Sequence, residues 1–146
     1  MSCTIDNVLK VELQLIDEKV KFLAKARTNP ELVIDYFPPF GTGEGYTSLE
    51  LLLASFSSCV STTVLTILRA KMSKTISVLH VTANGTVREE HPKCLSHIHV
   101  KLDITSCDLE DAEVKNALTI AEEKLCPVWA MIKGNVVVDV SFHINK

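Results

Sequence analysis

The stretch TSLELLLASFSSC, residues 47–59, decides the fold, because it opens the longest apolar helix that the sequence predicts. Thr47 and Glu50 have the spacing of a capping box, in which a hydroxyl and a carboxylate each bond a free backbone N–H at the start of a helix. We expect the helix to run to about Lys71 or Met72. It is apolar nearly all round and must be covered on both sides, which a chain of this size does awkwardly. A homodimer with this helix at its centre is the natural solution.

The same helix has about the length of a membrane span. Residues 49–68 nevertheless include Glu50 and seven Ser or Thr residues. A segment with that many polar groups is more typical of a helix buried inside a protein. The sequence therefore predicts a protein with no membrane contact.

The rest of the chain predicts mainly strands. Three short strands are expected before the long helix and three longer ones after it, at residues 10–15, 20–24, 32–36, 76–88, 98–104 and 136–144. Asp108 is expected to cap a second helix, which Pro127 interrupts before a short helix over residues 128–133. Its apolar face has helical spacing at Val114, Leu118, Ala121 and Leu125.

Strands and helices do not alternate strictly in this order, so the fold class is α+β with a largely antiparallel sheet. We see no linker, internal repeat or low-complexity segment in the 146 residues. The sequence predicts a single domain over residues 1–146.

Charge and cysteine usage narrow the function class. The formal net charge is −3 and the Lys and Arg residues are scattered, which gives no electrostatic case for a nucleic-acid or anionic-lipid partner. Five cysteines at widely spaced positions make no secretory disulfide framework, and the first residues lack the pattern of a signal peptide. We expect a cytoplasmic protein with reduced thiols.

Two cysteines stand in helices. Cys59 lies in the middle of the long helix, and Cys126 closes the second helix just before Pro127. Two thiols from two helices could meet in one core as a redox pair. The alternative is that each is a small buried hydrophobic residue, since free cysteine is among the most buried residue types.

The histidines offer a second cluster, at His91, Cys94, His97 and His99. Residue types that bind zinc lie within nine positions, but two of them fall on a predicted strand and two in the loop before it. Structural zinc motifs usually draw ligands from two turns separated by a longer loop. We therefore expect no metal, and no cofactor.

Three segments together resemble the OsmC/Ohr family of osmotically inducible and organic hydroperoxide resistance proteins. The segment from Ser48 to Cys59 resembles the first cysteine helix of that family, and the residues from Ala121 to Val128 resemble its second cysteine motif. The segment from Glu90 to Val100 resembles the loop and strand after the central hairpin. The resemblance implies an intertwined homodimer, with a six-stranded antiparallel sheet per subunit wrapped around two central helices and active sites at the subunit interface.

The resemblance also implies a chemistry. Cys59 would attack the O–O bond of an organic hydroperoxide, Cys126 would resolve the product as a disulfide, and an external dithiol would reduce that disulfide. Peroxidase members pair the attacking cysteine with an Arg from the N-terminal strands, for which Arg27 is the candidate here, although it could equally be a solvated turn residue.

One departure from the family pattern leaves a second function open for this protein. The peroxidase members carry a Glu ten residues before the attacking cysteine, where this chain has Leu49. Glu50, one position on, would lie on the opposite side of the helix from Cys59, and capping already explains it. The alternative function is a non-catalytic protein of this fold that binds a hydrophobic small molecule near the cysteines.

Overall fold

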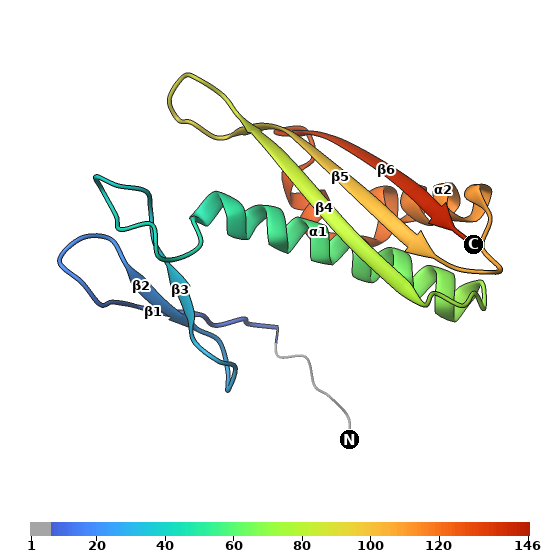
Figure 1. Cartoon of the computed structure of the whole chain (residues 1–146), viewed down its shortest axis with the longest axis horizontal. Coiled ribbons are helices and arrows are strands. Elements are labelled where there is room, and N and C mark those ends of the chain that lie inside the picture. Colours follow the sequence, from blue (N-terminus) through green and yellow to red (C-terminus); the bar gives the residue numbers. More distant parts are fainter. Residues whose placement is uncertain (1–6) are drawn as a thin grey trace. The chain divides into compact units, whose positions relative to one another are not determined.

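The computed structural model describes residues 7–146. The chain forms two compact units, Met1–Leu51 and Leu52–Lys146, and each is described by itself. Within residues 7–146, six strands divide between two three-stranded sheets, one in each unit (Figure 1). The same residues form three helices and two π-helical turns, so the predicted α+β class is confirmed.

The N-terminal unit holds an antiparallel sheet of β1 (Glu12–Leu15), β2 (Phe22–Lys25) and β3 (Leu32–Ile34). The glycine-rich loop after β3 is organised by the carboxylate of Asp35, which is almost fully buried. This carboxylate accepts hydrogen bonds from the Thr42 hydroxyl at 2.6 Å and from backbone N–H groups including that of Tyr36 at 2.8 Å. The Thr42 hydroxyl, followed by the backbone N–H groups, holds the pKa of Asp35 well below its ordinary value. A Cβ at Gly41 would lie 2.4 Å from this carboxylate, so only glycine lets the loop close around it.

Helix α1 (Ser48–Thr66) begins with the predicted capping box. The Thr47 N–H donates to the Glu50 carboxylate at 3.0 Å, and the Glu50 N–H donates to the Thr47 hydroxyl at 3.2 Å. The helix continues into the π-helical turn η1 (Ile67–Lys71). The span Ser48–Lys71 is long and apolar enough to cross a membrane by length and composition, a property that core helices of soluble proteins share.

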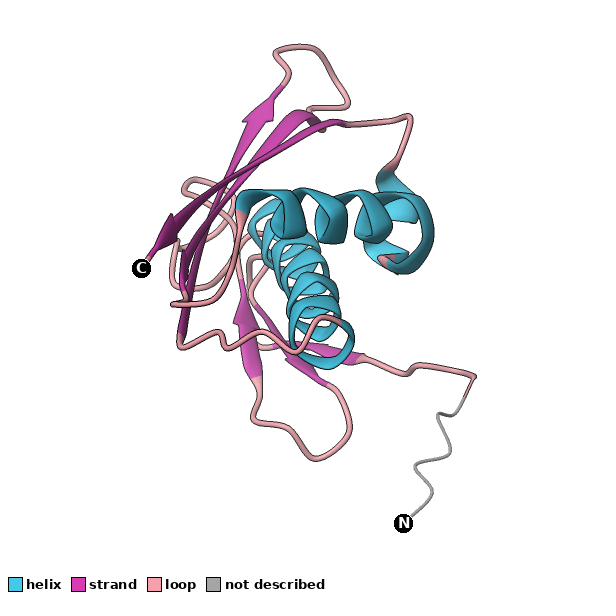
Figure 2. Cartoon of the chain, turned by 90° about the vertical axis from the view of Figure 1, so that its right-hand side faces the viewer, coloured by secondary structure: helices cyan, strands magenta, loops and turns pink. Residues whose placement is uncertain are grey.

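The second sheet has the order β4 (Val78–Val87), β5 (Leu95–Thr105), β6 (Val137–Asn145). Its inner face is apolar, and β5 supplies the most deeply buried side chains: Ile98, Val100, Leu102 and Ile104. Figures 1 and 2 show α1 and the later helices on one face of this sheet. Gly85 of β4 permits close packing there, because a Cβ at this position would lie 3.1 Å from the methyl groups of Leu53 in α1.

Two details of the sheets differ from the sequence prediction. The six strands form two sheets within the chain rather than one sheet of six, and β6 pairs with β5 in the parallel direction. The remaining pairings are antiparallel. The parallel pairing follows from the chain path, because two helices and a turn separate β5 from β6 and return the chain to the starting end of β5.

The helices between β5 and β6 are α2 (Asp111–Ile120), the π-helical turn η2 (Ala121–Leu125) and α3 (Pro127–Ile132). Asp108 does not cap α2. It accepts hydrogen bonds from the Thr75 N–H and the Ser106 hydroxyl instead. The capping box of α2 is formed by Glu110 and Glu113, two residues later than expected, because Asp108 is already engaged by the chain segment before β4.

Candidate thiol site

Cys59 and Cys126 lie in contact within the C-terminal unit. The Sγ atoms are 3.1 Å apart, and the Cys126 thiol donates a hydrogen bond to the sulfur of Cys59. Cys59 is half-buried in the middle of α1, whereas Cys126 is 2 % exposed. The structure thus brings together two thiols that are 67 residues apart in the sequence.

The π-helical turn η2 determines which side chain reaches Cys59. The Cys126 N–H donates to the Ala121 carbonyl at 2.9 Å, a bond that spans five residues instead of four. The extra residue rotates the end of the helix, so Cys126 points into the core where an α-helix would have placed Leu125. The expected position of Leu125 on the buried face is therefore wrong, and its side chain is 47 % exposed.

Cys126 is also the residue that precedes α3. It has an extended backbone, and Pro127 occupies the first helical position, where its missing N–H costs nothing. The dipeptide Cys126-Pro127 is the sequence signal for this placement. The π-helical turn had no comparable signal, because its residues also fit an ordinary α-helix.

An aromatic pair lies next in sequence to the thiols. The rings of Phe56 in α1 and Trp129 in α3 meet edge to face with centroids 5.5 Å apart, and both are buried. Phe56 lies three positions before Cys59, so the two side chains project from about the same side of α1. The contact packs α3 against α1. It therefore links the helix that contains Cys59 to the short helix that follows Cys126.

The thiol of Cys126 stays protonated at neutral pH. Burial, followed by the hydrogen bond to Cys59, raises the pKa of Cys126 to about 11. Cys126 therefore remains a neutral donor at physiological pH, and the sulfur of Cys59 is the acceptor.

The other candidate residues lie in the N-terminal unit. Arg27 is exposed in the turn between β2 and β3 and has a left-handed backbone with φ of 56°. Glu50 is engaged in the helix cap, and Glu44 pairs with Lys21 at 2.6 Å. Arg27 thus lies in a turn, where neither a helix nor a strand fixes the direction of its side chain.

The histidine cluster is divided between the β4–β5 loop, which contains His91 and Cys94, and β5, which contains His97 and His99. His97 pairs with Asp139 at 2.8 Å and His99 bonds the Ser141 hydroxyl at 2.9 Å, so both are engaged with β6. Within residues 7–146, no group of three or more His, Cys, Asp or Glu side chains is arranged to hold a metal ion.

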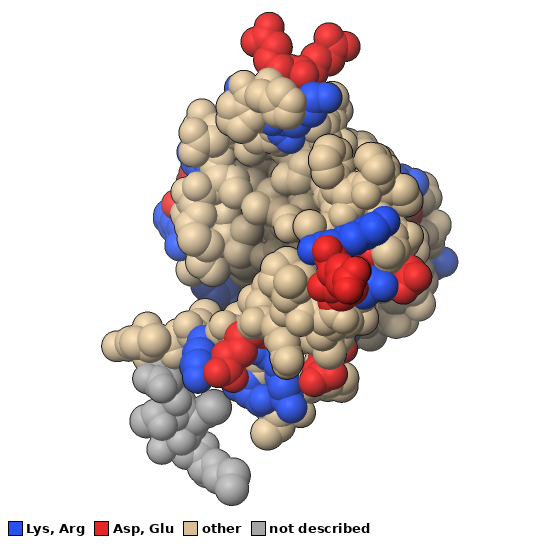
Figure 3. Space-filling view, turned by 90° about the vertical axis from the view of Figure 1, so that its left-hand side faces the viewer, with Lys and Arg blue, Asp and Glu red and all other residues tan. Residues whose placement is uncertain are grey.

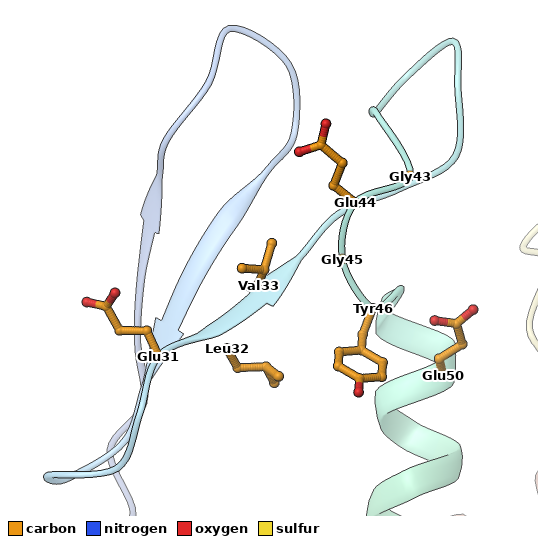
Figure 4. A pocket seen from close by; sticks show the side chains of 8 residues that line it. All are labelled: Glu31, Leu32, Val33, Gly43, Glu44, Gly45, Tyr46 and Glu50. Atoms are coloured by element: carbon orange, nitrogen blue, oxygen red, sulfur yellow. The ribbon is translucent and has the colours of Figure 1, made fainter.

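An open pocket of about 510 Å³ lies within the N-terminal unit (Figure 4). It is lined by residues of β3, the glycine-rich loop and the start of α1, among them Tyr46 and the carboxylates of Glu31, Glu44 and Glu50. Neither cysteine lines it. Figure 3 shows Lys and Arg side chains interspersed with Asp and Glu on one face of the molecule, without a broad patch of either sign.

The raised pKa of Cys126 predicts a loss of stability at alkaline pH. An unfolded cysteine ionises near pH 8.5. Between about pH 8.5 and 11 the unfolded state therefore loses this proton while the folded state keeps it, and stability falls as pH rises. Urea unfolding of the reduced protein should show a decrease on the order of 1–2 kcal/mol over that range. Cys126→Ser should lack this component because serine does not titrate there. Equal alkaline losses in the two proteins would contradict the assignment.

Comparison with known proteins places the chain in a family. Residues 41–141 match the sequence model of the family described as OsmC-like protein. Protein YhfA of Escherichia coli strain K12 is 27 % identical over 128 residues, which cover 87 % of this chain and 92 % of YhfA. The crystal structure of a hypothetical protein from Aquifex aeolicus has a TM-score of 0.81 at 29 % identity, covering 96 % of this chain and 98 % of that protein.

A more distant structure carries a functional name. The organic hydroperoxide resistance protein OhrB of Bacillus subtilis has a TM-score of 0.64 at 16 % identity, covering 93 % of this chain and 98 % of OhrB. At that identity the similarity shows the shared fold. The fold, the family match over residues 41–141 and the two cysteines in their helices agree: this chain belongs to the OsmC-like protein family.

Proposed function

We propose that this protein is a thiol peroxidase that reduces organic hydroperoxides through Cys59 and Cys126. The observation that carries the proposal is the 3.1 Å contact between the two sulfur atoms. Membership of the OsmC-like family supports it, as does the fold shared with a hydroperoxide resistance protein. The reaction needs the two thiols, the peroxide and an external dithiol.

The first step belongs to Cys59. Its thiolate attacks one oxygen of the O–O bond, which forms Cys59–S–OH and releases an alkoxide that becomes an alcohol after taking up a proton. Cys59 fits this role because it is the more exposed of the two sulfurs and accepts the hydrogen bond. Cys126 does not compete for the peroxide, because burial keeps it protonated.

The second step joins the two sulfurs. The thiol of Cys126 condenses with Cys59–S–OH, forming one S–S bond and releasing water. An external dithiol then reduces the bridge by thiol–disulfide exchange and becomes a disulfide itself. The short distance between the sulfurs protects Cys59 from further oxidation, since resolution is intramolecular.

Oxidation by a peroxide tests the thiol mechanism. One equivalent of cumene hydroperoxide should remove two thiols from the reduced protein, and peptide mapping should locate a Cys59–Cys126 disulfide. Cys59→Ser should abolish both effects, whereas Cys94→Ser, at an exposed cysteine, should change neither. Unchanged thiols in the parent protein, together with binding of a hydrophobic small molecule, would favour the non-catalytic alternative.

Arg27 is the proposed cation of the site. A thiolate among apolar side chains needs a nearby positive charge. Arg27, in the turn between β2 and β3, is the candidate for that charge. Its left-handed backbone restricts the choice of replacement, because only glycine, asparagine and aspartate adopt that conformation readily.

Replacement of Arg27 therefore uses asparagine. Arg27→Asn removes the charge and keeps the turn, so kcat/KM for cumene hydroperoxide should fall by about tenfold to a hundredfold at unchanged thermal stability. Lys25→Ala, which removes an exposed charge two residues earlier, is the matched control and should have little effect. Equal activities of the two variants would exclude Arg27 from the mechanism.

We also propose that the protein is a cytoplasmic homodimer whose two units act as one OsmC-like domain. Within the N-terminal unit, Leu13, Leu15, Phe37 and Phe40 are each about half exposed or more, which is unusual for a free surface. In β1 the leucines alternate with Glu12 and Gln14, so one face of this strand is apolar. A second copy of the chain would cover that face.

The alternation in β1 provides a paired test of the dimer. Leu13→Asp should raise the dimer dissociation constant by roughly tenfold or more, because it places a charge in an apolar interface. Gln14→Asp, on the opposite face of the same strand, should leave the dimer intact. Sedimentation velocity over a dilution series measures both. A monomeric parent protein, or equal weakening by the two changes, would refute the proposed interface.

A further inference from the structure

The π-helical turn η2 exposes an apolar side chain in order to bury a thiol. Leu125 is 47 % exposed, while Cys126, its neighbour, is 2 % exposed. Ala121, which begins the turn, is fully buried, so the two residues compete for the next inward position along the helix. In the observed arrangement Leu125 remains exposed to solvent. An ordinary α-helical turn would place its side chain in the buried position that Cys126 occupies.

The competing arrangement is an ordinary α-helical turn. Four α-helical residues advance the chain by about 400°, which would bring Leu125 into line with Ala121 and turn Cys126 about 100° further around the axis. Leu125 would then be inside and the Cys126 thiol would face outward. Pro127 begins α3 and its ring fixes its own φ angle, so the change of turn involves the residues before it.

Each arrangement makes interactions that the other gives up. The π-helical turn retains the bond from Cys126 to the Ala121 carbonyl and the contact between the sulfurs. The α-helical turn would bury the leucine and form shorter, better aligned backbone bonds. The charged side chains of Glu122, Glu123 and Lys124 are exposed, so they oppose the rotation little.

We propose that η2 is a two-state gate that controls access to Cys126. In the π-helical state Cys126 touches Cys59 and the disulfide can form; in the α-helical state Leu125 replaces Cys126 in the core and the thiol faces solvent. The inference rests on the proposed thiol function for its biological role, since the gate would set the fraction of Cys59–S–OH that is resolved within the chain. The disulfide, once formed, holds the turn in the π-helical state.

Alkylation of Cys126 tests the gate without any peroxide. The reduced full-length protein is treated with iodoacetamide, and the rate at Cys126 is measured by quantitative peptide mass spectrometry. Leu125→Ser removes the side chain that drives the α-helical state, so labelling of Cys126 should slow by roughly fivefold to tenfold. Met131→Ser is the matched control, because it also removes an exposed apolar side chain, but from α3 rather than from η2. It should leave the labelling rate of Cys126 unchanged.

A shortened turn provides a second variant. Deletion of Glu123 lets the Cys126 N–H reach the Ala121 carbonyl in α-helical geometry while the thiol still points inward. The deletion should therefore also slow the labelling of Cys126, and the Cys59–Cys126 disulfide should still form. Glu123→Ala keeps the length of the turn and should behave as the parent protein.

The two proposals fail in different ways. An unchanged or faster Cys126 rate in Leu125→Ser would overturn the gate, whatever the deletion does. If the parent protein forms no disulfide with cumene hydroperoxide but Leu125→Ser slows the labelling of Cys126, the peroxidase function is rejected and the gate is supported.

Discussion

The hydrogen bond between Cys126 and Cys59 is the interaction on which the proposed thiol chemistry depends. It requires the end of one helical segment to meet the middle of another so closely that the two sulfur atoms are 3.1 Å apart. The packing of α1 against the second sheet fixes one side, and the Phe56–Trp129 contact ties α3 to α1 on the other. Burial, followed by the hydrogen bond to Cys59, raises the pKa of Cys126, so this thiol stays protonated at neutral pH.

The features that could be predicted from the sequence are local ones. The capping box at Thr47 and Glu50 depends on two residues three positions apart, and the structure contains both of its hydrogen bonds. Alternation of polar and apolar residues predicts the strands of the second sheet to within a few positions, because exposure alternates along β4 and β6 and β5 has a buried face. The pairing of Cys59 with Cys126 came from the family resemblance, since spacing alone carries no information on their distance.

What could not be predicted depends on competition between alternatives of similar energy. The parallel pairing of β6 leaves the same alternating pattern as an antiparallel one would. Asp108 and Glu110 are both able to cap a helix, and the hydrogen bonds of Asp108 to Thr75 and Ser106 select the second. Leu125 has perfect helical spacing, yet one inserted residue in the turn gives its place to Cys126.

The proton on Cys126 reconciles the two proposed steps. A buried thiol with a pKa of about 11 is a poor nucleophile, so it leaves the peroxide to Cys59. The same thiol must later attack the sulfur of Cys59–S–OH, and that attack displaces a hydroxide. Because the hydroxide leaves beside the donor, it can accept the proton of Cys126 and depart as water. The proton that keeps Cys126 unreactive toward the peroxide in the first step is thus the proton that the leaving hydroxide needs in the second. The resolving step therefore requires no other base within the apolar site.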